Sequence, residues 1–423
     1  MNVIPQPAEG AARLRTLTVL IACALPIQVM GRATITVMVV GAMLCFLSLP
    51  EKSRYWRRVA QQARGPLGLM LAVTFILWLP NVFLSIDPQR SLTTAIRPFI
   101  YVGVATLFWA VLVEHRWLHN LSLRTLLLAS LVATMIATIA ETGVPELYWF
   151  LHFRGWLSVP LGTSLKSYSA LAVFMVPVFI WAGFRLRGSW AWLAALNVVG
   201  SLAFVWQTYN RAAIAGFVAM AVLAAIWTAL SKNSRPVKAL LLIGVIALLA
   251  GVLIWLNTTR SRPGFQGEWL FPLWLVDFQR QTIWKFALEL VERNFWFGLG
   301  INTINFAPGA DAIIPNTVGN LKMIPSHPHN WLLEVAAETG IFGVLSLVSV
   351  VAMSLLRYFR GFLQTGEGAY FVTACVATGY WFSGLFNFSF WSSWWQMSFV
   401  LVCAICLAHT SNSAPSTESK THL

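Results

Sequence analysis

The feature that most constrains the fold of this chain is a series of apolar runs long enough to cross a lipid bilayer. A spanning helix needs about 20 predominantly apolar residues. Of the 423 residues, 58% are hydrophobic and only 10% are charged, whereas a soluble protein carries about 25% charged residues. We therefore predict an all-α integral membrane protein with about 12 transmembrane helices, of which the first two are short enough to form one broken unit. The predicted spans are 17–31, 33–49, 67–86, 98–113, 121–140, 168–184, 190–208, 211–230, 237–256, 329–355, 368–388 and 391–409.

The net charge of +14 is better explained by membrane topology than by nucleic acid. If the N-terminus is cytoplasmic, the cytoplasmic segments hold 17 of the 29 basic residues: Arg13, Arg15, Lys52, Arg54, Arg57, Arg58, Arg64, Arg116, Arg124, Arg185, Arg187, Lys232, Arg235, Lys238, Arg357, Arg360 and Lys420. The short outward segments hold six: Arg32, Arg90, Arg97, Arg154, Lys166 and Arg211. The positive-inside rule then predicts that both termini are cytoplasmic and that 257–328 faces outward. Anionic membrane lipids are the expected partners of the basic excess.

The chain is expected to divide into four parts. Residues 1–256 form transmembrane helices 1–9, and 257–328 form one large outward loop with a lid-like composition. Residues 329–410 form helices 10–12, and 411–423 form a polar, disordered tail. No internal repeat is visible, which argues against an inverted-repeat transporter.

Within the outward loop, the stretch 276–295 has helical periodicity. Apolar residues recur every three to four positions, with Arg280, Lys285 and Glu289 between them. We predict an amphipathic surface helix that lies on the membrane with its apolar stripe facing the lipid. Phe297-Gly298-Leu299-Gly300 is expected to end it, because glycine tolerates the positive φ of a helix terminus.

His329 is the first candidate for chemistry. It lies just before, or one turn into, a predicted outward-facing helix start, with Asn330 beside it. A neutral imidazole accepts a proton near pH 7, so it is suited to act as a general base toward a hydroxyl. His327 precedes Pro328 and is the alternative candidate for this role.

Arg211 and Arg280 are the candidate anion-binding residues. Arg211 interrupts two apolar spans, and an unpaired arginine within a membrane is costly unless it serves a cavity or an anion. Arg280 lies on the polar face of the predicted surface helix. A guanidinium binds phosphate oxygens in a bidentate manner, which lysine cannot do. Supporting positive charge is expected from Lys166, Arg154, Arg90 and Arg97.

Outward arginines and one base at a membrane surface fit an anionic, lipid-linked donor. Transfer of a glycosyl group from a diphosphate needs stabilisation of the departing charge and deprotonation of the attacking hydroxyl. Arg211 and Arg280 are expected to supply the first requirement and His329 the second. No paired-carboxylate pattern for a divalent metal is visible in an outward loop, so no metal or other cofactor is expected.

Residues 329–343, reading HNWLLEVAAETGIFG, resemble the signature of the O-antigen ligase/polymerase superfamily. Arg280-x-x-Ile283-Trp284 with the later Gly298-x-Gly300 is similar to the block that precedes it in the family. Asn210-Arg211-Ala212 resembles the family's Ser-Arg-Gly/Ala step, with Asn210 in place of serine.

The resemblance implies a GT-C-like fold and a function at the periplasmic face of the bacterial inner membrane. That function is a metal-independent, inverting transfer of an undecaprenyl-diphosphate-linked O-antigen polysaccharide to lipid A–core oligosaccharide. His329 would be the base for the acceptor hydroxyl, and Arg211 and Arg280 would hold the diphosphate. A polymerase and a protein O-glycan ligase share this logic and remain open. A transporter or flippase would be expected to show repeat symmetry, and a scaffold protein would not need outward basic groups.

Overall fold

The computed structural model of the protein describes residues 10–152, 161–232, 271, 276–315, 317 and 319–410. The predicted span 237–256, the segment 257–270 and the tail 411–423 lie outside the described residues. Among the described residues the regular elements are helices, apart from one isolated β-bridge between Ile313 and Lys322. The helices are α1 (Ala11–Cys23), η1 (Pro26–Met30), α2 (Thr34–Leu47), α3 (Ser53–Ala63), α4 (Pro66–Leu84), α5 (Pro88–Glu114), α6 (Leu118–Thr142), α7 (Pro145–Leu151), α8 (Leu161–Phe174), α9 (Val176–Leu186), α10 (Ser189–Gln207), α11 (Arg211–Lys232), α13 (Phe278–Arg293), η2 (Ile304–Phe306), α14 (Trp331–Thr365), α15 (Gly368–Ser383) and α16 (Ser393–Leu407).

Six of the described helices are long and apolar enough to cross a membrane: α4, α5, α6, α10, α11 and α14. The pair α8 and α9, bent by 45°, provides a seventh candidate. These helices confirm an α-helical membrane protein. The predicted total of 12 spans stays a prediction, because α2 and α16 are shorter apolar helices.

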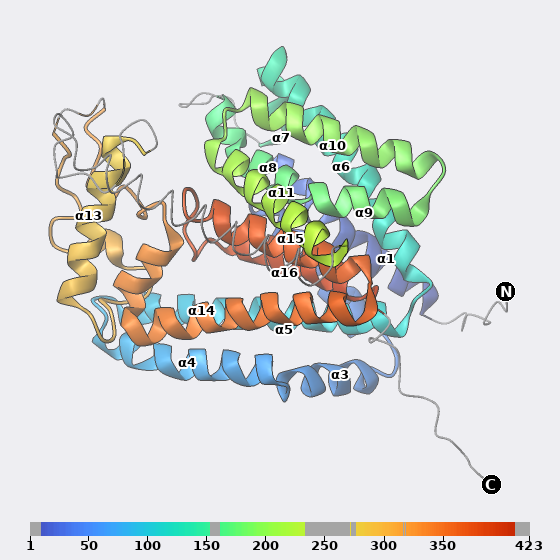
Figure 1. The fold of residues 1–423 in the computed structure, drawn as a ribbon, viewed down its shortest axis with the longest axis horizontal. Coiled ribbons are helices and arrows are strands. Elements are labelled where there is room, and N and C mark those ends of the chain that lie inside the picture. The colour runs from blue at the N-terminus through green and yellow to red at the C-terminus, as the bar shows by residue number, and fades with distance from the viewer. Residues whose placement is uncertain are drawn as a thin grey trace, which may run out of the picture.

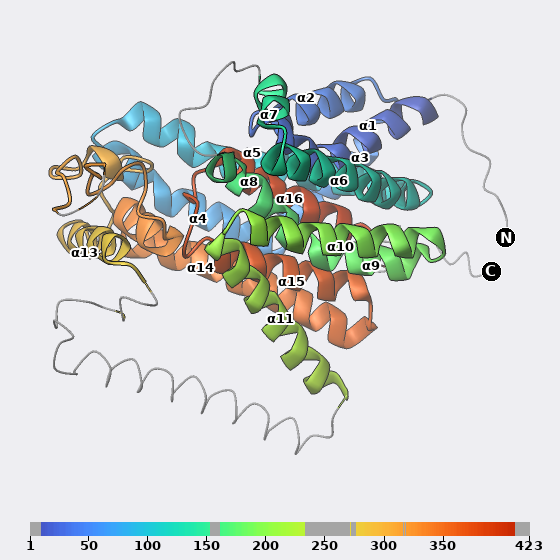
Figure 2. The ribbon, with the colours of Figure 1, turned by 90° about the horizontal axis from the view of Figure 1, so that it is seen from above.

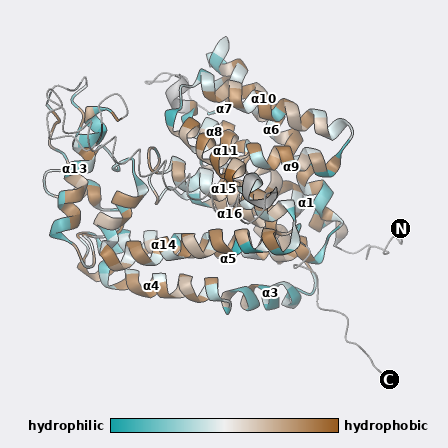
Figure 3. Ribbon diagram, viewed as in Figure 1, coloured by the Kyte–Doolittle hydropathy of each residue, from teal (hydrophilic) through white to brown (hydrophobic). Residues whose placement is uncertain are grey.

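The outer surface of the helix bundle is apolar. Phe83 on α4, Phe184 on α9 and Trp192 on α10 are 82%, 78% and 79% exposed. A water-soluble protein rarely exposes large apolar side chains this extensively, whereas lipid tails would cover them at no cost. Figure 3 shows hydrophobic residues along α4 and α14 and a concentration of hydrophilic residues on α3.

The connections between helices alternate between two ends of the bundle. The turns 85–87, 208–210 and 384–392 lie at the end that carries α13, which we call the α13 end (Figure 1). The turns 115–117, 187–188 and 366–367 lie at the other end, near α3, which we call the α3 end. The view from above shows the same separation (Figure 2). Of the two groups of basic residues separated by the positive-inside argument, those on turns that the structure describes follow this separation: Arg116 and Arg187 lie at the α3 end, and Arg211 follows a turn at the α13 end.

Helix α14 is broken by a close crossing of two backbone segments. Gly340 has φ +67° and ψ −173° within the helix. A Cβ at Gly340 would lie 2.3 Å from the carbonyl oxygen of Trp296, and one at Gly298 would lie 2.3 Å from the carbonyl carbon of Glu338. Backbone bonds from Leu299 to Ala337 (3.0 Å) and from Ile341 to Phe295 (2.8 Å) close the contact. Only glycine allows this approach, and we call it the glycine crossing.

The predicted surface helix is present, but the prediction that its apolar stripe faces lipid is wrong. Helix α13 covers 278–293, close to the predicted 276–295. Ile283, Trp284 and Leu290 are each at most 5% exposed, and they pack into a small core with the loop 299–324 and Ala337 of α14. The loop therefore covers the stripe, and α13 forms part of a compact cap on the bundle.

Candidate active site

His329 lies in the short segment that joins the cap to α14. Its backbone has φ +55°, a left-handed conformation that is uncommon for a residue with a side chain and that occurs at functional sites. The next residue, Asn330, is the N-cap of α14, and its side-chain oxygen accepts hydrogen bonds from the N–H groups of Leu332 (3.0 Å) and Leu333 (3.2 Å). His329 therefore precedes the helix, and Asn330 serves the helix end.

One backbone carbonyl holds both candidate histidines. His329 Nδ1 and His327 Nε2 each lie 3.0 Å from the carbonyl oxygen of Asn387, in the loop between α15 and α16. The ring centroids of the two histidines are 4.3 Å apart. A carbonyl oxygen only accepts hydrogen bonds, so both of these nitrogens carry hydrogen. Asn387 thereby fixes the tautomer of each ring.

The fixed tautomers distinguish the two histidines. With hydrogen on Nδ1, His329 presents the lone pair of Nε2. With hydrogen on Nε2, His327 has its lone pair on Nδ1, and that atom lies 2.8 Å from the hydroxyl of Ser326, which donates to it. His327 thus uses both ring nitrogens within the loop.

The environment keeps both imidazoles neutral near pH 7. Burial, together with a smaller influence of Arg280, lowers the pKa of His329 below its ordinary value of 6.5, while Asn387 and Asp277 act in the opposite direction. Burial and the neighbouring His329 lower the pKa of His327 to about 3. A neutral imidazole is the form that accepts a proton.

Arg280 occupies the first turn of α13, next to this segment. Asp277 caps the helix by accepting from the N–H of Arg280 (2.9 Å), and its carboxylate lies 3.7 Å from Nε of Arg280. The indole N–H of Trp284, one turn further along, donates to the carbonyl of Pro328 (3.0 Å). The helix that carries Arg280 is thus bonded directly to the residue before His329.

Arg211 begins α11 at the same end of the bundle. Asn210 caps the helix, because its side-chain oxygen accepts from the N–H of Ala213 (3.2 Å). The amide of Asn210 donates to the carbonyl of Lys166 (2.8 Å) and to the hydroxyl of Ser169 (2.9 Å) on α8. Asparagine at this position thus fixes the start of α11 against a second helix.

The three predicted residues are linked in series by electrostatic influence, Arg211 on Arg280 and Arg280 on His329. Burial lowers the pKa of Arg280, Asp277 opposes this change, and the positive charge of Arg211 adds to it. Arg280 in turn acts on His329. The arginines thus lie within electrostatic range of each other, and Arg280 within range of the imidazole. An anion bound near both guanidinium groups would relieve this like-charge repulsion.

The predicted supporting residues lie in different places. The side chain of Lys166 is half-buried on α8, and its carbonyl bonds to Asn210 beside Arg211. Arg90 donates to the carbonyl of Asn302 (2.7 Å) and stacks on Phe306 (4.9 Å), so it holds the cap instead of joining the histidines. Arg154 lies outside the described residues.

Sequence reasoning missed the residues that hold the loops around the site. Glu338 is fully buried, and its carboxylate accepts from the N–H groups of Asn302 (2.7 Å) and Ile304 (2.9 Å) and from the indole of Trp391. Glu334 accepts from the hydroxyl of Ser389 (2.5 Å) and the N–H of Phe390 (2.7 Å). The signal was present as two acidic residues in an apolar helix, which a membrane tolerates only when they have partners.

Arg32 is a further cation that the sequence did not single out as part of the site. It lies between η1 and α2, with its guanidinium 5.3 Å from the ring centre of Trp394 and 5.9 Å from that of Phe388. Its charge also acts on His327. Each candidate histidine thus has an arginine within electrostatic range, Arg32 for His327 and Arg280 for His329.

Comparison with known proteins shows a sequence similarity to one family. Residues 196–348, which contain Arg211, Arg280 and His329, match the family model described as O-antigen ligase. An O-antigen ligase of Pseudomonas aeruginosa is 25% identical over 334 residues, which cover 63% of this chain and 79% of that protein. Proteins named as polysaccharide ligases in Rickettsia prowazekii and Rickettsia conorii are each 24% identical over 127 residues. Those matches cover 30% of this chain and only 31% and 30% of the rickettsial proteins.

Proposed function

We propose, from the premise that the chain is a member of the O-antigen ligase superfamily through residues 196–348, that it is a membrane-embedded glycosyltransferase. It transfers an O-antigen polysaccharide from undecaprenyl diphosphate to lipid A–core oligosaccharide. The transfer occurs at the periplasmic face of the bacterial inner membrane, which corresponds to the α13 end, and both termini are cytoplasmic. The observation that carries the proposal is the hydrogen bond from Trp284 to Pro328, which joins the helix of Arg280 to the segment of His329; the electrostatic influence of Arg211 on Arg280 supports it.

His329 acts as the general base. The acceptor hydroxyl oxygen attacks the anomeric carbon of the donor sugar while its proton passes to Nε2 of His329, the nitrogen that carries the lone pair. The resulting imidazolium keeps its Nδ1–H donor toward the carbonyl of Asn387, which stabilises the positive charge.

Arg211 and Arg280 stabilise the leaving group. The bond between the anomeric carbon and the diphosphate oxygen breaks, and its electron pair remains on the diphosphate. Two guanidinium groups that already repel each other gain most when negative charge develops between them. A single displacement of this kind inverts the anomeric centre and requires no metal ion to carry the charge.

The proposal can be tested by reconstitution of the purified protein with undecaprenyl-diphosphate-linked glycan and lipid A–core in liposomes. We expect glycan to appear on the acceptor and undecaprenyl diphosphate to be released, and activity should survive excess chelator. Arg211→Lys and Arg280→Lys should each reduce the rate, because both retain charge but lose bidentate geometry.

Other products in the same assay would redirect the proposal. Extension of the lipid-linked glycan itself would indicate a polymerase, and transfer only to an added protein would indicate a protein O-glycan ligase. Movement of intact donor between leaflets without any transfer would make the protein a flippase and overturn the proposal.

A further inference from the structure

A charged cavity lies at the α3 end of the bundle, opposite the candidate active site. Its volume is about 320 Å³, and its lining includes Arg116, Trp117, His119, Asn120, Arg185 and His409. Three separate parts of the chain form it: the turn between α5 and α6, the end of α9 and the segment after α16. Glu367, between α14 and α15, completes one wall.

The inner wall of this cavity is an aromatic stack. The rings of His119 and His409 are 4.2 Å apart, and Trp181 meets His409 edge-on at 5.0 Å. His119 Nε2 donates to the carbonyl of Leu112 (2.9 Å), and His409 Nδ1 donates to the carbonyl of Ile405 (2.8 Å). The two rings therefore form the wall, and each has one nitrogen left that can accept a hydrogen bond. The charged side chains of the cavity lie at its rim.

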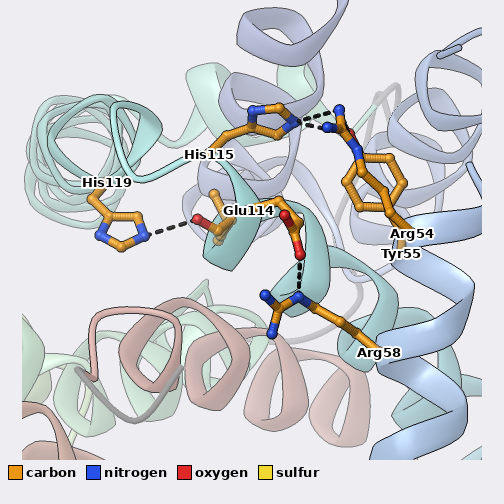
Figure 4. A network of polar contacts seen from close by, with 7 residues as sticks. Arg54, Tyr55, Arg58, Glu114, His115 and His119 are labelled. Carbon is orange, nitrogen blue, oxygen red and sulfur yellow. Dashed lines mark hydrogen bonds and ion pairs between the residues drawn. The ribbon is translucent and has the colours of Figure 1, made fainter. Parts of the chain in front are cut away.

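The rim has more positive than negative charge. Arg116 and Arg185 are both exposed at the rim, and both act electrostatically on His119. Glu367 acts on Arg185. Among the residues that the structure describes, Arg116 forms no ion pair, and the carboxylate nearest to it in sequence, Glu114, is bound by Arg58 (Figure 4).

Neighbouring contacts hold the turn that lines one wall of the cavity. Figure 4 shows α3 joined to the end of α5, where Arg54 and Tyr55 contact the ring of His115 and Arg58 binds Glu114. His115 and Trp117 also make an edge contact at 6.3 Å. These contacts with α3 therefore hold the turn that carries Arg116 and Trp117 in place.

We propose that this cavity binds the phosphate group of an anionic phospholipid from the leaflet at the α3 end. It is bordered by the ends of α5, α6 and α14, which are long and apolar enough to cross a membrane, and lipid phosphates lie at the depth of such helix ends. Two guanidinium groups and the amide of Asn120 supply donors, and Trp117 has the amphipathic ring that is common at headgroup depth. Basic pockets between membrane helices are typical binding sites for such head groups.

The experiment measures binding to the full-length protein in neutral detergent by the shift of its thermal unfolding midpoint. Phosphatidylglycerol, phosphatidylcholine and inorganic phosphate are compared. Phosphatidylglycerol should raise the midpoint, and phosphatidylcholine should not. Each of Arg116→Gln and Arg185→Gln should weaken phosphatidylglycerol about fivefold, and the double variant about 25-fold. Arg187→Gln removes the same charge at the same end but outside the cavity, and it should bind like the wild-type protein.

The outcomes separate the possible sources of the anion. An equal shift with inorganic phosphate would support the anion site and assign it to a soluble phosphate. Unchanged phosphatidylglycerol binding in the double variant, or an equal effect of phosphatidylcholine, would overturn the proposal. If the double variant does not fold, a photoactivatable phosphatidylglycerol on the wild-type protein decides the question. It should label peptides containing 115–120 or 185–188, and labelling confined to other segments would contradict the site.

Discussion

At the scale of single residues, the two histidines differ in whether their second ring nitrogen can bind a substrate. Both bond to the carbonyl of Asn387, but only His329 has its second nitrogen outside the hydrogen bonds of the loop. His327 uses its second nitrogen to accept from Ser326. The residue that takes a proton should therefore be His329, and His327 should only help to position the loop.

Paired alanine substitutions test this difference. His329→Ala should lower the transfer rate by about a hundredfold or more, the usual contribution of a general base. His327→Ala removes one hydrogen bond from the Asn387 carbonyl and should cost less than about tenfold. The measurement is single-turnover transfer in liposomes, with circular dichroism to verify folding. A larger loss for His327→Ala would exchange the two assignments.

The pH dependence of transfer follows from the environment of His329. Because its pKa lies below 6.5, the imidazole should be neutral at pH 7, and the rate should fall only when the pH drops through that lowered value. Asp277 raises this pKa, so Asp277→Asn should move the acid limb of the rate profile to lower pH while it keeps a helix cap.

A variant on the same helix controls for net charge. Glu289→Gln removes the same charge from α13, where Glu289 pairs with Arg293 at 3.6 Å. It should leave the acid limb in place. An identical profile for Asp277→Asn and the wild-type protein would show that Asp277 does not act on the base.

At the scale of elements, the glycine crossing joins the cap to α14. We expect Gly340→Ala to destabilise the protein by about 1–3 kcal/mol or more, because the new methyl group meets the backbone at Trp296 and the left-handed φ is unfavourable. Gly103→Ala in α5 is the matched control, since a Cβ there meets nothing within 4 Å. It should be neutral or stabilising, by up to about 1 kcal/mol. Thermal unfolding in detergent measures both, and equal midpoints would contradict a structural role for the crossing.

The elements also show how far sequence patterns reach. Apolar length predicted α4 and α10 to within about two residues, and periodicity predicted α13, because both signals are local. The break in α14 at Gly340 was not predicted, because it depends on a contact with the backbone of 296–298, which is distant in sequence. For the same reason the apolar stripe of α13 was assigned to lipid: a sequence does not reveal which apolar surface covers another.

For the site, residues with unusual chemistry in an apolar context could be singled out from the sequence. Arg211, Arg280 and His329 differ from their surroundings in this way, and their roles stay a prediction, supported by the influence of Arg211 on Arg280 and of Arg280 on His329. Asn387 was not predictable, because it contributes a backbone oxygen that every residue has. Glu334 and Glu338 carried a signal, but their role as anchors for two loops required the partners to be seen.

At the scale of the whole molecule, the two charged regions lie at opposite ends, which predicts their accessibility. In a variant without the five native cysteines, Asn320→Cys in the cap should react with a membrane-impermeant thiol reagent added to intact spheroplasts. Ser189→Cys, at the start of α10 near the α3 end, should react only after the membrane is opened. Labelling of both positions in intact spheroplasts would contradict the predicted orientation.

The shared carbonyl of Asn387 has a consequence for genetics. Side-chain replacement at position 387 tests the amide but leaves the main-chain oxygen in place, so saturation screens will record the position as permissive even if that oxygen is indispensable. Incorporating an α-hydroxy acid at position 388 would weaken that oxygen as an acceptor by turning the amide into an ester. This backbone substitution would show whether activity depends on the main-chain oxygen, which replacement of the side chain does not test.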